Sequence, residues 1–179
     1  LDAVAHGFET VLLRHLSKEI DLEGSLDVDS LSLDGVTWAF DQIGDSVFVS
    51  APDGGWQPAG PQVVGLHYHG QPGKDPYWGG MYLTGDYIFS LGIGLTTIPP
   101  NHGKAWYPCF DQFRARSAYT YGITSAGGKR FHGQGHLVQT DSLGGDTIRR
   151  VFDMPQPIPT YLSAIAVADY QDWDTTHVG

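Results

Sequence analysis

The sequence predicts an all-β fold, an antiparallel sandwich or barrel, and three observations support this prediction. Glycine occurs 24 times and proline 11 times in 179 residues, without any repeat period. Glu occurs three times and Lys four times, so the chain holds little material for exposed helix faces. Short apolar segments recur about every ten residues between turn residues, which indicates a sandwich or barrel and not βαβ units.

The N-terminal third is predicted to form strands joined by tight turns, after an ambiguous start. Within the first twenty residues the apolar spacing fits a helical stripe, while residues 9–13 fit a strand equally well. Apolar residues are separated by Ser and Asp over 22–33 and lead to Asp34-Gly35, a sequence typical of a hairpin turn. Further strands are predicted at 36–40, 47–49 and 63–68.

The remainder of the chain follows the same pattern, with one irregular segment. Residues 97–103 are expected to be irregular because the consecutive Pro99 and Pro100 remove two hydrogen-bond donors and fix φ. The sequence Ala-Gly-Gly-Lys at 126–129 indicates a hairpin turn. Strands are predicted at 81–83, 88–91, 119–123 and 161–167, the last being the most apolar and therefore central.

Length, charge and cysteine content restrict the class of protein. Residues 1–179 suit a single domain with a core of its own. One cysteine excludes an intramolecular disulfide framework and a Cys-based zinc site, and fits either redox compartment. A formal net charge of −10 argues against nucleic acid or anionic lipid as partner, and no apolar run is long enough to be a membrane segment. Because the chain begins with Leu1, we expect it to be processed or part of a longer protein.

His67 and His69 form the only histidine pair with metal-ligand spacing on a predicted strand. Residues i and i+2 of a strand share one face, so both imidazoles would reach one metal ion, with His132 or His136 as further ligands. The alternative is a strand face that points to solvent. We expect no metal site in this chain and keep His67 and His69 as the alternative ligands.

Three further candidate chemistries were weighed. Seventeen aspartates make accidental carboxylate pairs inevitable, and many of them lie beside Gly or Ser, where they form turns, so no carboxylate pair for glycoside chemistry is assigned. Cys109 has aromatic neighbours, and we expect a buried, unreactive thiol. Trp56, Tyr77 and Trp78 lie in Gly/Pro-rich loops, where they either contact a carbohydrate or protein ligand or pin the loops onto the fold.

Two separated motifs suggest a family. Residues 105–111 read Ala-Trp-Tyr-Pro-Cys-Phe-Asp, and residues 157–162 read Pro-Ile-Pro-Thr-Tyr-Leu. In this order they resemble an aromatic-Pro-Cys-Phe-Asp segment and a later strand of the aminopeptidase N and leukotriene-hydrolase group of zinc peptidases. The resemblance extends over roughly residues 62–170 and is plausible back to about residue 20.

The resemblance implies a domain without catalytic residues. In that family these motifs belong to the N-terminal domain, a saddle-shaped antiparallel β-sandwich that precedes the catalytic domain. The family's zinc motif, His-Glu-x-x-His, belongs to the catalytic domain, and no histidine of this chain is followed by Glu. The resemblance therefore implies an inactive chain that shapes the peptide-substrate cleft of a larger metallopeptidase. Its partners would be the downstream catalytic domain, where the zinc is expected, and a peptide substrate.

Two positions depart from the family where it contacts substrate. Nine residues before Pro108 the family usually has an acidic or amide residue that holds the substrate's α-amino group, and this chain has Pro99. Thr97 stands where Gln is common. The resemblance thus implies Thr97 and Pro99 as substrate-cleft residues without the usual amine anchor. The alternative function is a carbohydrate- or protein-binding scaffold module that contacts its ligand through Trp56, Tyr77 and Trp78.

Overall fold

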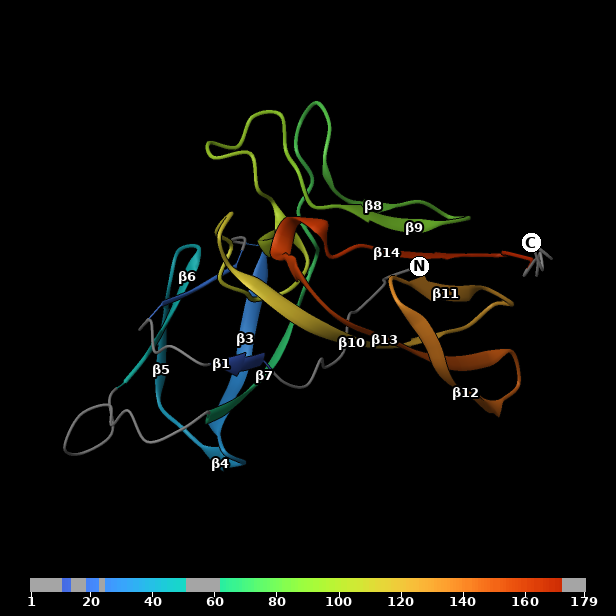
Figure 1. The fold of residues 1–179 in the computed structure, drawn as a ribbon, viewed down its shortest axis with the longest axis horizontal. Coiled ribbons are helices and arrows are strands. Elements are labelled where there is room, and N and C mark those ends of the chain that lie inside the picture. Colours follow the sequence, from blue (N-terminus) through green and yellow to red (C-terminus); the bar gives the residue numbers. More distant parts are fainter. Residues whose placement is uncertain (1–10, 14–18, 23–24, 51–61, 172–179) are drawn as a thin grey trace.

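The computed structural model describes residues 11–13, 19–22, 25–50 and 62–171. Regular structure in these ranges is almost entirely β, and every strand pair is antiparallel, which confirms the predicted all-β sandwich class (Figure 1). Trp56 and most of the first twenty residues lie outside the described residues. Within the described part, no helix is both apolar enough and long enough to span a membrane.

Two sheets from the first part of the chain pack around one core. One sheet has the order β1 (Val11–Leu13), β7 (Gln62–Gly70), β3 (Leu26–Leu33) and β4 (Val36–Thr37). The other has the order β2 (Glu19–Asp21), β6 (Ser46–Val49) and β5 (Phe40–Ile43). Their inward-facing apolar side chains form the first core cluster, which includes Leu22, Leu31, Val47, Leu66 and Tyr68.

Two further sheets enclose a second core cluster. One has the order β10 (Arg116–Ser125), β13 (Thr147–Pro159) and β12 (His136–Gly144). The other has the order β11 (Arg130–Gly133), β14 (Ile165–Ala168), β9 (Ile88–Leu91) and β8 (Gly80–Leu83), and Figure 1 shows it above β10 and β13. Both sheets contribute to the cluster, which includes Met81, Tyr121, Phe131, Phe152 and Val167.

The Pro-Cys segment joins the two cores. It follows the short 3-10 helix η1 (Gly103–Ala105), and Asp21 and Cys109 exchange two backbone hydrogen bonds of 2.9 Å each. The Tyr68 hydroxyl on β7 donates to the Trp106 carbonyl at 3.2 Å. Tyr107 packs against both clusters, so this segment fixes the second sheet pair to the first.

The structure confirms the predicted turn at Asp34-Gly35, the irregular segment at the two prolines and four of the predicted strands. Asp34 and Gly35 both have positive φ, 49° and 81°, and connect β3 to β4 as a tight hairpin. Of the segment 97–103 that was expected to be irregular, residues 97–102 lie outside the named helices and strands, as the two prolines required, and only Gly103 belongs to η1. The strands predicted at 47–49, 63–68, 81–83 and 88–91 correspond to β6, β7, β8 and β9.

Three predictions about the strands need correction, and one strand was missed. The strand predicted at 36–40 is divided between β4 and β5, which belong to different sheets. The turn at 126–129 exists, but the strands that it joins, β10 and β11, enter different sheets, so it is not a hairpin. The predicted strand 161–167 is interrupted by η2 (Thr160–Leu162), and only its second part becomes β14, which does lie inside its sheet. No strand was predicted over 136–144, where β12 is exposed almost throughout and shows no buried alternation.

Candidate functional site

The sequence-predicted cleft residues, Thr97 and Pro99, lie in one of two neighbouring loops. One loop, 71–79, precedes β8, and the other, 92–102, follows β9 and contains Thr97 and Pro99; both project from the same end of the fold (Figure 1). The second loop folds back on itself. Gly94 N donates to the Pro100 carbonyl at 2.9 Å, and His102 N donates to the Gly92 carbonyl at 2.6 Å. The tip of this loop therefore has a defined position.

A buried carboxylate, that of Asp75, joins the two loops. Its Oδ1 accepts hydrogen bonds from the backbone N–H of Tyr77 and of Trp78, at 2.9 and 3.0 Å. Its Oδ2 accepts from Thr96 N at 2.7 Å and from Thr96 Oγ1 at 2.6 Å. Burial alone would raise the pKa of Asp75, but the four hydrogen bonds to its carboxylate lower the pKa by more than burial raises it. The pKa of Asp75 is therefore well below its usual range, and the carboxyl is ionised at neutral pH.

The backbones of the two loops also touch directly. Leu95 N donates to the Trp78 carbonyl at 3.1 Å. Gly79 has φ +117°, and a Cβ placed on it would lie 1.7 Å from the Ile93 carbonyl oxygen, so only glycine fits this approach. Together with Asp75, these contacts make the loop pair a rigid unit.

This rigid unit presents large apolar side chains to solvent. The exposed fraction is 98% for Ile98, 79% for Tyr77, 67% for Leu95 and 45% for Trp78. We call these four residues the loop patch. Single exposed apolar residues are ordinary, but a preorganised group of this kind is typical of a surface that meets a partner.

The polar side chains of the second loop point back into the protein. Thr97 Oγ1 donates to the Gly94 carbonyl at 3.2 Å, and the Thr96 hydroxyl is bound to Asp75. Asn101 is buried, and its Nδ2 donates to the Asp111 carbonyl. The loop patch therefore has apolar chemistry, with the hydroxyls beside it already engaged.

Three strands of the sheet next to the loops, β8, β9 and β14, are largely apolar on both faces, whereas β11 contributes Arg130 and His132. Its inner face packs into the second core cluster through Met81 and Val167. Strand alternation and register place Tyr82, Phe89 and Ala166 in one row on the opposite face, which we call the outer sheet face. The rings of Tyr82 and Phe89 stack at 4.6 Å, nearly parallel.

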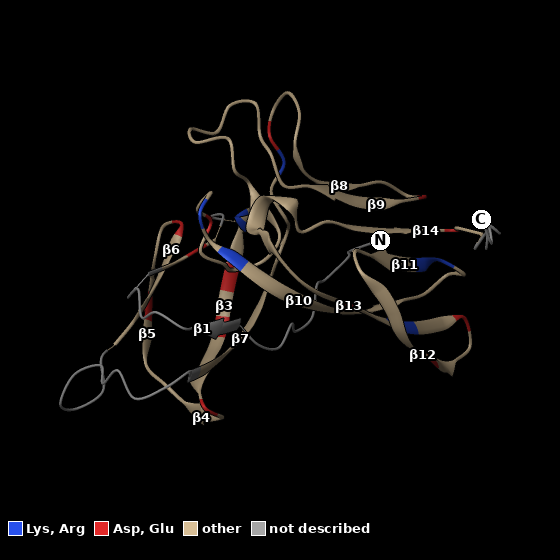
Figure 2. Ribbon diagram, viewed as in Figure 1, with Lys and Arg blue, Asp and Glu red and all other residues tan. Residues whose placement is uncertain are grey.

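Tyr82 connects the outer sheet face to the loops. Gly79 N donates to the Tyr82 hydroxyl at 3.0 Å, and Lys74 Nζ lies 4.5 Å from the centre of the Tyr82 ring. Asp86 is the only charged residue from 76 to 103, and Figure 2 shows β8, β9 and β14 without charge along their length. Tyr82 thus links the outer sheet face to the first loop, with the Lys74 ammonium against its ring.

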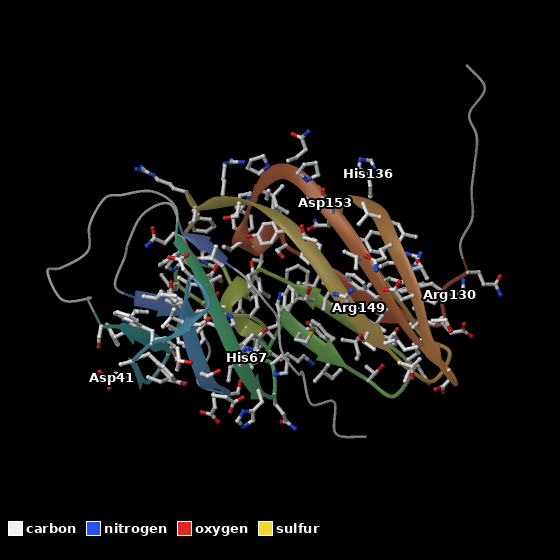
Figure 3. The ribbon with its side chains drawn as sticks, turned by 90° about the horizontal axis from the view of Figure 1, so that it is seen from below. Asp41, His67, Arg130, His136, Arg149 and Asp153 are labelled. Atoms are coloured by element: carbon white, nitrogen blue, oxygen red, sulfur yellow. The ribbon has the colours of Figure 1, made fainter. Side chains whose placement is uncertain are left out.

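The opposite sheet carries polar and charged side chains on β10 and β13, while β12 also exposes Leu137, Val138 and Leu143. Thr120 Oγ1 on β10 donates to Asp153 Oδ1 on β13 at 2.9 Å, and Arg149 lies 4.0 Å from Asp141 of β12. Figure 3 shows the side chains of His136, Arg149 and Asp153 on this side of the molecule.

The base of the second loop is held by the motif that suggested the family. Asp111 Oδ1 accepts a hydrogen bond from Thr160 Oγ1 at 2.8 Å, which links the Pro-Cys-Phe-Asp segment to the Pro-Ile-Pro-Thr segment. Asp111 N donates to Asp21 Oδ2 at 3.0 Å. Both motifs therefore have a structural role. They fix the end of the loop that follows β9, where Asn101 donates to the Asp111 carbonyl.

Cys109 lies inside the same junction. Burial, with the nearby carboxylates of Asp111 and Asp21, raises the pKa of its thiol well above the usual value. Such a thiol is protonated and weakly nucleophilic at neutral pH, in agreement with the predicted structural role.

The histidine pair lies on β7, which belongs to another sheet than β8 and β9. His67 and His69 are exposed on β7, and His69 Nδ1 is 2.9 Å from Asp29 Oδ1. His132 lies on β11, with its Nε2 3.0 Å from Arg150 Nη1, and His136 lies on β12. Within the described ranges no three His, Cys, Asp or Glu side chains gather to hold a metal ion, so the alternative at His67 and His69 stays a prediction without a third ligand.

Sequence reasoning missed the residues that build the loop patch. Asp75 was not singled out in the sequence, although it binds Thr96, 21 residues away. An Asp followed by Pro76 indicates a turn, but not a partner at this distance. Leu95 and Ile98 look like ordinary core residues in the sequence, and only the folded loop shows that they point outward.

The sequence matches no protein-family model and no curated protein. Its structure is similar to an M1 zinc metallopeptidase of Deinococcus radiodurans solved with a Tyr-Ser-Ala substrate, with a TM-score of 0.72, 21% identity and 84% of this chain covered. It is also similar to aminopeptidase A of Legionella pneumophila, with a TM-score of 0.70 and 14% identity over 88% of this chain. Yeast LTA4 hydrolase gives a TM-score of 0.62 and 22% identity over 93% of this chain.

These similarities establish a shared fold. The chain spans only part of each protein: 34% of the Deinococcus chain, 18% of the Legionella chain and 26% of the yeast chain. The fold suggested by the two sequence motifs is thus found in solved M1 zinc metallopeptidases and their relatives, where it forms one portion of a larger chain.

Proposed function

We propose that the chain is the N-terminal domain of an aminopeptidase N-like zinc metallopeptidase, where it packs against the catalytic part of the same polypeptide and shapes the peptide-substrate cleft. The exposed apolar side chains of the loop patch carry this proposal. Left in water, such a surface favours association. The similarity to about a third of the Deinococcus metallopeptidase supports the remaining part of such a polypeptide as the occupant.

The proposed role is one of positioning. Thr97 and Pro99 lie in the second loop, at the border of the loop patch, and would line the cleft. The contribution of this chain is then to hold a peptide in place and exclude water from it, which lowers the entropic cost of reaction. A zinc ion bound by a His-Glu-x-x-His motif in the catalytic part would supply the Lewis acid. This chain contains no such motif.

The test uses the full-length parent protein with a charge introduced into the loop patch. Leu95→Asp should lower kcat/KM for peptide hydrolysis by about tenfold or more, because an interface carboxylate loses its hydration without a partner. Val138→Asp is the matched control, since Val138 is an exposed apolar residue on β12. Equal activity of the two variants, or a parent sequence without His-Glu-x-x-His, would contradict the proposal.

One observation favours the alternative function, a carbohydrate- or protein-binding module. Tyr77 and Trp78 are exposed aromatic side chains on rigid loops, and aromatic rings in such positions stack on sugars. Binding of the chain to a glycan array, lost on Trp78→Ala but retained in Val138→Ala, would support this function. Trp56, the third predicted contact, lies outside the described residues.

A further inference from the structure

His67 and His69 lie side by side on the solvent face of the sheet that contains β7 and β3. Their neighbours Leu66 and Tyr68 are buried in the first core cluster, so strand alternation turns both imidazoles outward, and both histidines are exposed. Positions i and i+2 of a strand are about 6.6 Å apart. Two imidazoles at this spacing can converge on one ion with each nitrogen about 2.0–2.1 Å from it.

A β-bulge in β3 brings a carboxylate to His69. The register between β3 and β7 shifts between Val28 and Ser30, so Asp29 is the extra residue of the bulge. Its Oδ1 lies 2.9 Å from His69 Nδ1. Gln42 of β5 holds this part of β3, since its Oε1 accepts from Val28 N at 2.9 Å and its Nε2 donates to a β3 carbonyl at 2.8 Å. The carboxylate is therefore placed by the backbone of the bulge.

The contact with Asp29 determines which nitrogen of His69 can bind a ligand. A neutral imidazole has one N–H and one lone pair, and a carboxylate is only an acceptor, so the Nδ1 proton faces Asp29. The lone pair then lies on Nε2. A carboxylate on the other ring nitrogen is the usual second contact of a metal-binding histidine, because it orients the ring and makes it a stronger ligand. The sequence alone favoured a strand face that points to solvent, and this contact changes the assignment.

The charges around the pair favour a cation of a particular class. Asp27 is exposed and lies directly opposite His69 in the register, and neither β3 nor β7 contains Lys or Arg. Imidazole nitrogen suits zinc, copper and nickel ions, whereas magnesium and calcium ions prefer oxygen ligands. The ligand predicted by this chemistry is thus a transition-metal ion.

We propose that His67 and His69 bind one divalent transition-metal ion of the zinc, copper or nickel class, with Asp29 as the positioning residue of His69. The described residues bring no third His, Cys, Asp or Glu ligand to the ion, so water fills its remaining positions. The ion is then exchangeable and held less tightly than in a four-ligand structural site. This site is separate from the proposed function and from the zinc expected in the catalytic part.

The experiment is calorimetric titration of the chain with zinc chloride at neutral pH. His67→Ala and His69→Ala should each weaken Zn²⁺ binding at this site by about tenfold or more, because the second imidazole no longer acts within the same molecule. Asp29→Ala should weaken it by about 10–100-fold. His136→Ala, which removes another exposed histidine on β12, is the matched control and should keep the wild-type affinity. Excess Mg²⁺ should not compete.

NMR distinguishes the positioning role of Asp29 from a general effect on the fold. Long-range ¹H–¹⁵N spectra should show Zn²⁺ shifting Nε2 of His69 while Nδ1 keeps its proton. Asp29→Glu, which retains a carboxylate, should recover part of the affinity that Asp29→Ala loses. No Zn²⁺ binding by the wild type, or equal binding by a variant that lacks both His67 and His69, would overturn the site. Binding through Nδ1 of His69, or equal losses in Asp29→Glu and Asp29→Ala, would overturn the role of Asp29.

Discussion

Removing apolar side chains from the loop patch should affect the full-length parent and leave the isolated chain unchanged. The perturbation is the double variant Tyr77→Ser and Leu95→Ser. Both side chains are largely exposed in this chain, by 79% and 67%. In the isolated chain, substitutions at such surface positions change the free energy of unfolding by no more than about 0.5 kcal/mol.

The magnitude in the parent follows from the area that a partner would cover. Complete burial of a large apolar side chain contributes about 1.5–3 kcal/mol. Scaled by the exposed fraction, covering Leu95 would contribute about 1–2 kcal/mol, and covering Tyr77 a similar amount. The double variant should therefore destabilise the junction of this domain with the rest of the parent by about 2–4 kcal/mol.

The assay is urea unfolding of the isolated chain and of the parent, each as wild type and as double variant. The parent variant should lose stability by the calculated amount, or show an early transition from this domain, while the isolated chain keeps its midpoint. The pair Leu137→Ser and Val138→Ser on β12 is the control. A loss of equal size in the isolated chain would refute the reasoning, because it would show that these residues stabilise the domain itself.

Three further predictions concern the fold that holds the loop patch. Asp75→Asn should speed amide hydrogen exchange in both loops at neutral pH. Because folding lowers the pKa of Asp75, its carboxylate stabilises the loops fully above the ordinary Asp pKa, and this stabilisation is lost as pH falls through the pKa of the folded state. The difference in exchange rate between variant and wild type should therefore shrink in acid, and a difference that grows in acid would contradict this. Phe131→Ala should cost about 3–5 kcal/mol in denaturant unfolding, since Phe131 is fully buried in the second core cluster, and a cost below about 1 kcal/mol would contradict that packing. Cys109 should react with a thiol reagent only after unfolding, because its thiol is buried with a raised pKa, and rapid native labelling would contradict this.

Features set by neighbouring residues could be predicted from the sequence. Asp34-Gly35 supplies two positive φ angles, which suffices to place a hairpin turn. The alternation of apolar and polar residues along the sequence predicted strands with one buried face, such as β7. It failed for β12, where both faces are largely exposed, and it could not show that the turn at 126–129 leads from one sheet into another.

The candidate site depends on contacts between distant parts of the chain. Asp75 and Thr96 meet only because β8 and β9 bring the two loops together. The apolar outer sheet face is likewise invisible in the sequence, since a strand with two apolar faces reads as a buried strand. Thr97 and Pro99 were found through resemblance to a family, whereas Ile98, between them, was found through its exposure.

The central claim is that the rest of the parent polypeptide covers the loop patch, and cysteine labelling at Leu95→Cys tests it most directly. In the isolated chain this cysteine should react quickly, while the native Cys109 stays buried. In the full-length parent, peptide-level mass spectrometry should show labelling slowed by about tenfold or more, with Val138→Cys reacting equally fast in both. Equal labelling of Leu95→Cys in the isolated chain and in the parent would contradict the account.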